Sequence, residues 1–408
     1  MSSSRHQQLP PQEQLSALET LRLACFANPL DGLISLALIS AVLAAAWQLL
    51  RWALLQAQWG VIAANSTLLA LGRYPEPQRW RLWLLLWLLS TAAGLSWGLL
   101  RRQSWPRNDL LATAVLTGLT LWAPAAVGLP PAVQAHWWGL TSWLLLLRSG
   151  AGAMAKRLPP SVLRCWPLLW PVVYVSGMGL IAGGFGLLRV PSPLWGGLLL
   201  TLIEACFAML LCLPLGLALA LGRRSSLPLL RMAAVAYIEF IRGAPLITLL
   251  FLGQNILGFL LPGGLSPDRI WRAAWVLTVF ASAYVAEALR AGLAAIPRGQ
   301  VEAARSLGLN TAQTLSHVVL PQAIKVALPA LVGQFISLLQ DTTLLSLIGL
   351  MELLGTARTV LANPEFLGRN AEVYVVLALL FWCCCAALGL GSRALEVRLN
   401  RQRSAAVR

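Results

Sequence analysis

Residues 297–310 read Pro-Arg-Gly-Gln-Val-Glu-Ala-Ala-Arg-Ser-Leu-Gly-Leu-Asn, and the polar stretch continues to Pro321 between two long apolar segments. Its opening proline suits the first turn of a helix, where the missing N–H is not needed, and Gly308 suits a helix end. Asn310, with Gln313 three residues later, is a good cap for a second short helix that ends at Pro321. The stretch therefore predicts a helix–turn–helix.

A lipid bilayer gives no reason for such a surface piece between two membrane segments. Small and apolar residues recur along both expected helices, at a spacing that gives each helix one apolar face. These residues are Val301, Ala304, Leu307, Leu315, Val318 and Val319. Because no other part of the chain is expected to cover this face, it predicts a binding partner outside the membrane.

The composition places the flanking segments in a membrane. Of the 408 residues, 58% are hydrophobic and only 11% are charged, whereas soluble domains carry roughly 25% charged residues. Apolar runs of roughly 20 residues recur, and they do not alternate polar with apolar positions as membrane β-strands do. Helices satisfy their own backbone hydrogen bonds in lipid. The sequence therefore predicts an all-α, polytopic helical membrane protein.

The formal net charge is +16, with 31 Lys and Arg residues. Nucleic-acid binding and the positive-inside bias of cytoplasmic loops both produce such an excess. No basic stripe interleaved with aromatic residues occurs, so we expect contact with membrane lipid and no nucleic-acid partner. The seven cysteines and three histidines lack metal-ligand spacing. We therefore expect no metal site and no cofactor in this chain.

The apolar runs divide the chain into two modules. Residues 1–30 are expected to form a cytoplasmic or interfacial tail, and residues 31–190 an N-terminal extension of about three to four spans. Residues 191–395 are expected to form a five-span core, and residues 396–408 a basic C-terminal tail. The expected spans are 32–55, 81–100, 109–129 and 165–188 in the extension, and 195–221, 229–262, 270–295, 322–350 and 372–392 in the core. Residues 56–80 and 351–371 are expected to be loops.

Arginines cluster in alternate loops of the core. The loop 222–231, the stretch 297–321 and the C-terminal tail carry more of them than the loops 263–268 and 351–371. The positive-inside bias then places 297–321 and the C-terminus in the cytoplasm. The side of the N-terminus stays open, because residues 137–148 are apolar but too short to decide between a re-entrant piece and a partial span.

Four motifs follow one another in the core. They read Tyr-Ile-Glu-Phe-Ile-Arg-Gly-Ala-Pro-Leu at 237–246, Ala-Tyr-Val-Ala-Glu-Ala-Leu-Arg at 283–290, Glu-Ala-Ala…Gly at 302–308 and Gln-Asp-Thr-Thr at 340–343. Together they resemble the permease subunit of bacterial amino-acid ABC importers, the binding-protein-dependent type I family. Gly72-Arg73-Tyr74-Pro75 and Asn363-Pro364-Glu365-Phe366 are most similar to the long permease subunit of the general L-amino-acid importers.

This resemblance implies that the partner of 297–321 is a dimer of ATP-binding subunits. It places Glu302, Ala303, Ala304 and Gly308 at the docking contact, where small alanines allow close approach to a cleft. ATP and Mg belong to that partner, because no Gly-x-x-x-x-Gly-Lys-Ser/Thr phosphate loop occurs in this chain. The resemblance also implies a periplasmic amino-acid-binding protein. Five core spans are too few to enclose a path, so we expect a second permease subunit.

Ionisable residues at membrane depth need a protein or water partner, since each costs roughly 2.5–3.5 kcal/mol at the centre of a helix. They are Glu204, Glu239, Arg242, Glu287, Arg290 and Asp341. The three-residue spacing predicts that Glu239 pairs with Arg242 along one helix face, and Glu287 with Arg290. For Glu204 and Glu287 we expect structural roles.

Glu239, Arg242 and Asp341 are also candidates for the substrate path, and this alternative to structural pairing stays open. Gly243 and Pro245 interrupt the helix beside Arg242, which frees backbone groups for a zwitterion. Next to Asp341, Gln340, Thr342 and Thr343 add polar side chains to the same path. Gln340 stands where the family usually has lysine, so the charge preference for the substrate stays open.

The sequence thus predicts a multi-pass permease of the bacterial inner (plasma) membrane that imports amino acids by alternating access and is not itself an enzyme. A secondary transporter or channel for small polar solutes is the alternative, but it would show an inverted repeat and leave 297–321 without a role. A membrane enzyme would need clustered acidic or histidine residues, and only scattered ones occur. The amino acids carried, and the choice between a homodimer and a heterodimer of permeases, stay open.

Overall fold

The computed structural model describes residues 25, 28–101, 110, 113–118, 120, 130–155, 157–159, 165–260 and 267–406. The chain divides into two compact units, Met1–Gln58 and Trp59–Arg408. In the first unit, helix α2 (Pro29–Leu55) is long and apolar enough to cross a bilayer, and none of its residues is buried. Most of the expected tail 1–30 and of the expected span 109–129 lies outside the described residues.

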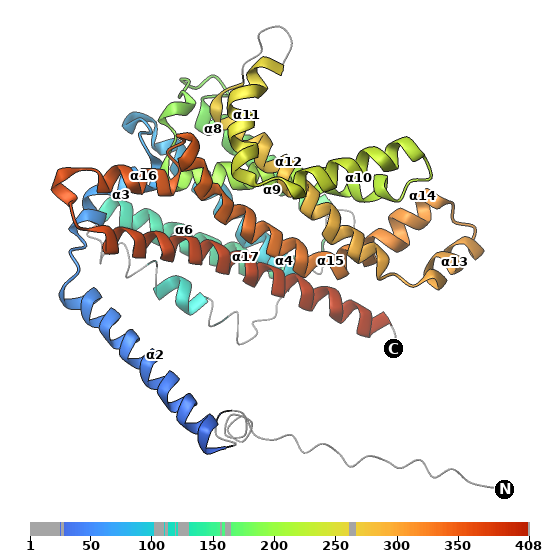
Figure 1. Ribbon diagram of the computed structural model, residues 1–408, viewed down its shortest axis with the longest axis horizontal. Helices are drawn as coiled ribbons and strands as arrows, with labels where there is room; N and C mark the ends of the chain where they lie inside the picture. Colours follow the sequence, from blue (N-terminus) through green and yellow to red (C-terminus); the bar gives the residue numbers. More distant parts are fainter. Residues whose placement is uncertain are drawn as a thin grey trace. The chain divides into compact units, whose positions relative to one another are not determined.

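Among its described residues the second unit consists of helices joined by turns and short irregular segments, with two isolated β-bridges (Figure 1). Its N-terminal part contains α3 (Gly60–Leu71), η1 (Glu76–Gln78), α4 (Trp80–Arg101), α6 (Pro131–Met154), η2 (Trp166–Leu168), α8 (Leu169–Ala182) and η3 (Ser192–Leu194). Its C-terminal part contains α9 (Gly197–Arg223), α10 (Pro228–Gly243), α11 (Leu246–Leu260), α12 (Arg269–Ala294), α13 (Arg298–Ser306), α14 (Thr311–Gln313), η5 (Thr314–Val319), α15 (Leu320–Asp341), η6 (Thr342–Ile348), α16 (Leu353–Leu361), η7 (Pro364–Phe366) and α17 (Asn370–Ala406).

Helix α12 lies at the centre of the C-terminal part, with α9 against one side of it and α15 against another, and α17 packs on α15 (Figure 1). Small residues make this packing close. A Cβ atom on Gly292 of α12 would lie 2.4 Å from the backbone oxygen of Ala323 on α15, so only glycine fits there. Membrane helices associate through such small residues, because lipid supplies no hydrophobic driving force between them.

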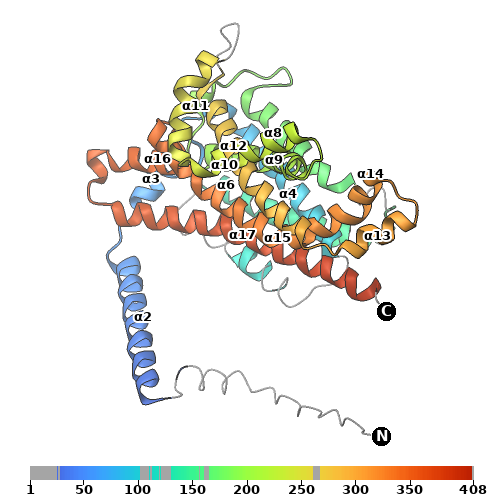
Figure 2. The same ribbon diagram turned by 45° about the vertical axis from the view of Figure 1, so that its right-hand side comes forward.

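The expected span 229–262 is broken where the sequence predicts an interruption, at Ala244 and Pro245 directly after Gly243. Helices α10 and α11 on either side of the break meet at 107°. Figures 1 and 2 show α11 turning away from the direction of α10. Proline supplies no N–H to continue the helix, and the residue before it is restricted to extended backbone.

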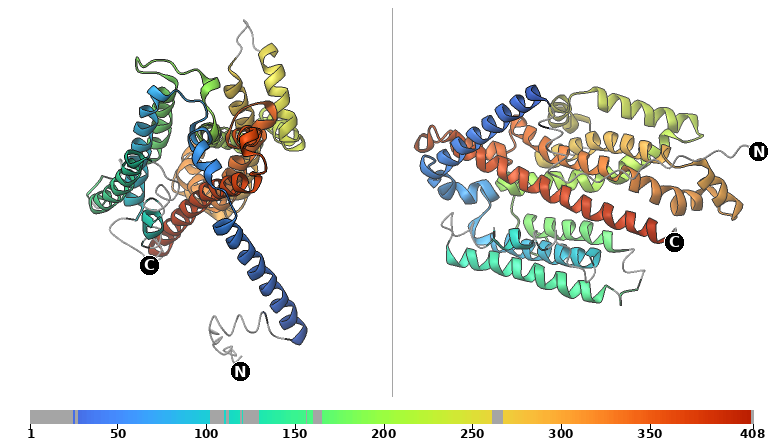
Figure 3. Two further views of the ribbon diagram at one scale, coloured as in Figure 1. Left: turned by 90° about the vertical axis from the view of Figure 1, so that its left-hand side faces the viewer. Right: turned by 90° about the horizontal axis from the view of Figure 1, so that it is seen from below.

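The helices α4, α6 and α8 form a second bundle, seen from below in Figure 3. The short segment 137–148 proves to be part of the 24-residue helix α6, which is long enough to span a bilayer but does not count among the apolar spans by composition. Arg148 of α6 is buried, and its guanidinium lies 5.0 Å from the ring centre of Trp97 on α4. This contact gives a cation an aromatic partner inside the bundle.

Two segments expected to be loops contain helices instead. Helix α3 lies within 56–80 and α16 within 351–371, and both are too short to stand as spans. They form one apolar cluster with the first turns of α17, made of Val61, Leu69, Leu353, Ala357, Val360, Val373 and Leu377. Helices of this length gain most of their stability from such tertiary packing, which local sequence does not reveal.

The motif Gly72-Arg73-Tyr74-Pro75 joins the two bundles. Gly72 has φ +66°, and a Cβ atom there would lie 2.5 Å from the backbone of Gly196 at the start of α9. Tyr74 is buried, and its hydroxyl donates a hydrogen bond to the backbone oxygen of Ile181 at 3.0 Å. The motif therefore has a structural role, because Gly72 and Tyr74 pack against other parts of the fold.

By length and composition, six helices of the described residues are long and apolar enough to cross a membrane, and the bent pair α10–α11 makes a seventh if it counts as one span. The core spans expected at 195–221, 270–295 and 372–392 coincide with α9, α12 and the first part of α17. The span expected at 322–350 changes its character near the end, because η6 replaces the α-helix from Thr342 onward.

Glu352 begins α16 at the N-cap position. Its carboxylate accepts hydrogen bonds from the backbone N–H groups of Leu354 and Gly355, each at 2.8 Å, and the residue is fully buried. Burial raises the pKa of this carboxyl from 4.5 to about 7, against the opposing effects of the two N–H donors and of Arg358. The folded chain thus holds this proton more tightly than the unfolded chain.

We therefore expect a stability contribution that is fully present below about pH 4.5 and is lost as the pH rises through about 7. At about 1.4 kcal/mol per pKa unit, the loss is at most roughly 3 kcal/mol. The measurement is the melting temperature of the detergent-purified protein at pH 5 and pH 8, for wild type and Glu352→Gln. The Gln variant, which has no proton to lose, should show the smaller drop; equal drops would contradict the assignment.

Candidate functional site

The polar stretch 297–321 folds as a helix and a turn, as its sequence predicts. Helix α13 (Arg298–Ser306) ends in a turn in which the Gly308 N–H donates to the Arg305 oxygen at 2.9 Å and the Leu309 N–H to the Ala304 oxygen at 3.2 Å. This pair of bonds is a Schellman motif, and it requires left-handed backbone at Gly308, whose φ is +79°. A side chain at that position would strain the backbone but would meet no neighbouring atom of the residues that the structure describes.

The second helix begins as predicted and ends elsewhere. Asn310 and Gln313 form the expected capping box, with the Gln313 N–H donating to Asn310 Oδ1 at 2.8 Å and the Asn310 N–H to Gln313 Oε1 at 3.0 Å. The expected end at Pro321 is wrong. The helix passes through one π-helical turn and continues directly into α15, because proline is tolerated in the first turn of a helical segment.

The apolar face of this stretch is mostly covered by the chain itself, which corrects the expectation that it has no protein of its own to bury against. Ala304 and Val319 are buried, and Val301 and Leu315 pack against the main core cluster. Ala304 therefore faces this chain and does not offer a small surface to a partner. Its size has an internal reason, since it lies where α13 packs on the rest of the molecule.

An exposed group remains at the tip of the stretch. Leu307 has 82% of its surface exposed, which is unusual for a large apolar side chain at a turn of polar surroundings. Glu302, Ala303 and Gly308 are exposed beside it. We call these four residues the exposed tip. Sequence reasoning found three of them, and missed Leu307 as an exposed group because the helical period assigned it to the buried face.

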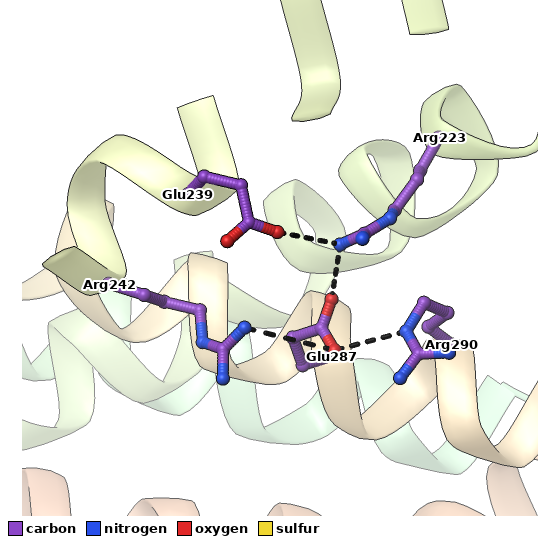
Figure 4. A network of polar contacts seen from close by, with 5 residues as sticks. All are labelled: Arg223, Glu239, Arg242, Glu287 and Arg290. Carbon is purple, nitrogen blue, oxygen red and sulfur yellow. Dashed lines mark hydrogen bonds and ion pairs between the residues drawn. The ribbon is translucent and has the colours of Figure 1, made fainter. Parts of the chain in front are cut away.

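A network of charged side chains joins α9, α10 and α12 (Figure 4). Glu287 of α12 is its hub: Arg223 Nη1 lies 2.5 Å from Oε1, while Arg290 Nε and Arg242 Nη1 lie 3.0 and 3.9 Å from Oε2. Glu239 of α10 lies 3.4 Å from the same Arg223 Nη1. Three arginines and two glutamates leave one positive charge in excess. The hub is the least exposed member, at 19% of its side chain.

One of the two ion pairs expected from the three-residue spacing is present in this network, and the other is not. Glu287 and Arg290 pair across three residues of α12, as predicted. Glu239 and Arg242 form no ion pair with each other in the described part of the chain; each contacts a residue of another helix instead. Sequence reasoning missed the role of Arg223, which counts as an ordinary loop arginine until α9 and α12 are placed side by side.

Residues of the motif 237–246 thus connect α10 to the neighbouring helix α12. The Tyr237 hydroxyl donates to the Val279 oxygen of α12 at 2.9 Å, and Arg242 lies 5.7 Å from the ring centre of Tyr284. Glu287 precedes the start of α13 by eleven residues on the same run of chain. About two turns of α12 therefore separate the hub from the connection to α13.

The other expected path residues, Gln340 to Thr343, lie where α15 changes into η6. Gln340 is exposed, with Nε2 3.9 Å from the sulfur of Cys385, and Asp341 is half-buried. Thr342 is buried and donates to the Leu339 oxygen, and Thr343 donates to the Gln340 oxygen, so both hydroxyls are engaged with their own backbone. No hydrogen bond or ion pair between described residues joins this group to the network of Figure 4.

Glu204 of α9 is fully buried, and neither of its carboxylate oxygens has a hydrogen-bond partner among the described residues. The structural pairing expected for it is therefore not found in this part of the chain.

Replacing the hub should cost more stability than replacing the outer glutamate. Glu287→Gln removes the charge that faces three arginines, so we expect the free energy of unfolding to fall by about 1–3 kcal/mol. Glu239→Gln removes one contact of a 58% exposed side chain, so the loss should stay below about 1 kcal/mol. Melting temperatures of the purified variants in one detergent provide the comparison. A larger loss for Glu239→Gln would contradict the assignment of the hub.

The comparisons with known proteins agree with these features. Residues 212–401 match the family model described as binding-protein-dependent transport system inner membrane component. The chain is 35% identical over 348 residues to the glutamate/glutamine/aspartate/asparagine transport system permease protein BztC of Rhodobacter capsulatus, a match that covers 84% of this chain and 79% of that protein.

Two further matches cover a smaller part of this chain. The chain is 43% identical over 240 residues to the inner membrane amino-acid ABC transporter permease protein YhdY of Escherichia coli K12, which covers 59% of this chain and 65% of that protein. A solved structure described as "Crystal structure of an amino acid ABC transporter with histidines" is 34% identical, covers 50% of this chain and 92% of its own, and has a TM-score of 0.44.

These curated relatives are transport permeases and not enzymes. Their inner-membrane assignment agrees with the six apolar helices that the structure describes. The chain therefore belongs to the family of binding-protein-dependent transport system inner membrane components, as a multi-pass protein of the inner membrane.

Proposed function

We propose that this chain is the permease subunit of an ATP-driven importer of amino acids, and that the exposed tip docks on a separate ATP-binding subunit. The relatives support the substrate class, because the two curated permeases described above are both named for amino-acid transport. BztC is named for glutamate, glutamine, aspartate and asparagine, so these four amino acids are the first substrates to test.

The single observation that carries the docking proposal is the exposure of Leu307. A large apolar side chain, 82% exposed, projects at the tip of a turn whose conformation is held rigid by the Schellman bonds and the capping box. A rigid turn with one apolar residue and one acidic residue, Glu302, fits into a cleft of a partner at small entropic cost. ATP and Mg would be bound by that partner and not by this chain.

The proposed mechanism uses α12 as the connecting element. Closure of the ATP-binding subunits moves α13, and α13 follows α12 after a connection of three residues. Because α12 is packed tightly between α9 and α15, its movement alters the contacts of Glu287 with Arg223 and Arg242. The network then exchanges partners as α10 shifts against α12. Glu239 and Arg242 take part in this switching, and Gln340, Asp341, Thr342 and Thr343 supply polar groups where α15 changes into η6.

A second permease subunit completes the path in this proposal, and a periplasmic amino-acid-binding protein delivers the substrate. The α10 and α11 helices carry exposed apolar side chains, among them Phe240, Phe251 and Leu252, which a neighbouring membrane subunit would cover. The family description, which names binding-protein dependence, supports the second partner.

The docking proposal predicts a specific loss of coupling. Leu307→Ser should reduce ATP-driven amino-acid uptake by tenfold or more, because the apolar contact with the ATP-binding subunit is lost. The matched control is Leu367→Ser, since Leu367 is also an exposed leucine that caps a short helix. Both variants should keep wild-type abundance in the membrane and a wild-type melting temperature. Equal uptake by the two variants would contradict docking at Leu307.

Reconstitution tests the function itself. The chain is co-expressed with the ATP-binding subunit, permease and binding protein encoded beside it, and uptake of labelled glutamate, glutamine, aspartate and asparagine into proteoliposomes is measured with and without internal ATP. We expect uptake that needs both ATP and the binding protein. Uptake that proceeds without the ATP-binding subunit would instead indicate a secondary transporter or channel.

A further inference from the structure

A short hairpin, residues 183–190, leads from the end of α8 towards η3. The Val190 N–H donates to the Ala182 oxygen at 3.1 Å and closes the hairpin at its base. Gly183 has φ +92°, and a Cβ atom there would collide with the Leu188 oxygen, so the turn requires glycine. The hairpin is therefore a defined structure, held by backbone contacts on both of its arms.

Phe185, in the middle of this hairpin, has an unusual backbone conformation. Its φ is +58°, the one positive φ of a non-glycine residue in the described part of the chain. An aromatic residue rarely adopts this left-handed conformation, because its Cβ atom approaches the following carbonyl oxygen. The side chain is nevertheless 75% exposed, so burial within the chain does not offset the strain. Such a residue needs a compensating interaction outside the chain.

The ring of Phe185 lies back over α8. A Cβ atom on Gly179 would lie 2.5 Å from Cε2 of this ring. Gly179 is on the same helix face as Val172 and Val175, since three and then four residues separate them, and both valines are exposed. The ring therefore takes the place of the side chain that Gly179 lacks, and it extends the exposed apolar face of α8.

Contacts with α4 locate the hairpin along the bundle. Helix α4 lies in a segment that is long and apolar enough to cross a membrane, and α8 runs antiparallel to it. Trp166 Nε1 donates to Ser96 Oγ at 2.9 Å near one end, and Arg81 Nη1 donates to the Leu188 oxygen at 2.8 Å near the other. The hairpin thus lies beside the first residues of α4, where Trp80 is exposed. Exposed tryptophan is typical of the membrane–water boundary.

The length of α8 supports a membrane contact at this end. Its 14 residues extend about 21 Å, and even with the three-residue turn η2 it stays below the roughly 30 Å of a hydrocarbon core. Phe185 and Leu188, both exposed, add apolar surface beyond its last residue. Arg189 beside them is exposed, and none of the ion pairs between described residues includes it. An arginine there can place its charge among lipid phosphates while its stem stays in apolar surroundings.

We propose that the hairpin 183–190 is a lipid anchor. Phe185 and Leu188 insert at the boundary between acyl chains and headgroups, and Arg189 binds a headgroup phosphate. The partner is the phospholipid of the leaflet at this end of α4 and α8. The hairpin thereby completes the apolar length of α8 and fixes the depth of the bundle α4, α6 and α8 in the bilayer. This inference does not depend on the proposed transport function.

The test is photo-cross-linking of the purified full-length chain in nanodiscs of phosphatidylcholine and phosphatidylglycerol. The photoreactive amino acid p-benzoylphenylalanine replaces Phe185 or Leu188, one at a time, and mass spectrometry counts phospholipid adducts after irradiation. The matched control carries the same amino acid in place of Glu76, whose side chain is 83% exposed and which lies in the loop before α4. Both hairpin positions should give about fivefold more adducts than the control, because only they reach the acyl chains.

A second measurement tests the phosphate contact. Arg189→Gln, combined with the photoreactive group at Leu188, should lower the share of phosphatidylglycerol among the adducts by about twofold or more, because the charge that attracts the anionic lipid is lost. The matched control is Arg157→Gln, which removes an exposed arginine that follows α6 and should leave the share unchanged. An unchanged share in Arg189→Gln would overturn the phosphate contact.

Two outcomes would overturn the lipid anchor itself. One is an adduct yield at both hairpin positions no higher than at Glu76. The other appears in cells that co-express the neighbouring transport genes: a cross-link from Phe185 to another protein in place of lipid would make the hairpin a protein-docking surface. Because Phe185 and Leu188 are tested separately, one variant that fails to fold leaves the other to decide the question.

Discussion

The close packing of α12 is the constraint on which the rest of this structure depends. It is buried against α9 on one side and against α15 on another, and glycine and alanine at the contacts bring the backbones near one another. A helix held in this way cannot bend locally without losing dispersion contacts along its length. The hub of the charge network and the connection that leads into α13 therefore lie on one tightly packed helix.

The charge network depends on the fixed position of α12. A carboxylate in the middle of three arginines is costly to desolvate, and it is favourable only while the helices that carry the arginines keep their positions. Glu287 is fixed by α12, while Arg223 and Arg242 come from α9 and α10. The distances range from 2.5 Å for Arg223 to 3.9 Å for Arg242, so the contact with α10 is the looser of the two.

The differences between expectation and structure have one physical origin. The sequence shows which residues of α13 and α14 are apolar, and it locates the capping box at Asn310 and Gln313, because both are local properties. It does not show which apolar residues the chain covers itself. Ala304 and Val319 turn inward and Leu307 outward, although all three belong to the same helical pattern. Likewise α3 and α16 are stabilised by packing together with α17. Both are too short for their helical pattern to be recognised from the sequence.

By itself the sequence determined the helical membrane fold, the break at Ala244 and Pro245 and the motifs that led to the family. These follow from hydropathy, caps and backbone restrictions, each of which acts over a few neighbouring residues. Only the tertiary structure decided that Arg223 meets Glu287, and that Glu239 and Arg242 find partners on other helices. These residues lie far apart in the chain, and their distances depend on how helices pack, which no local pattern records.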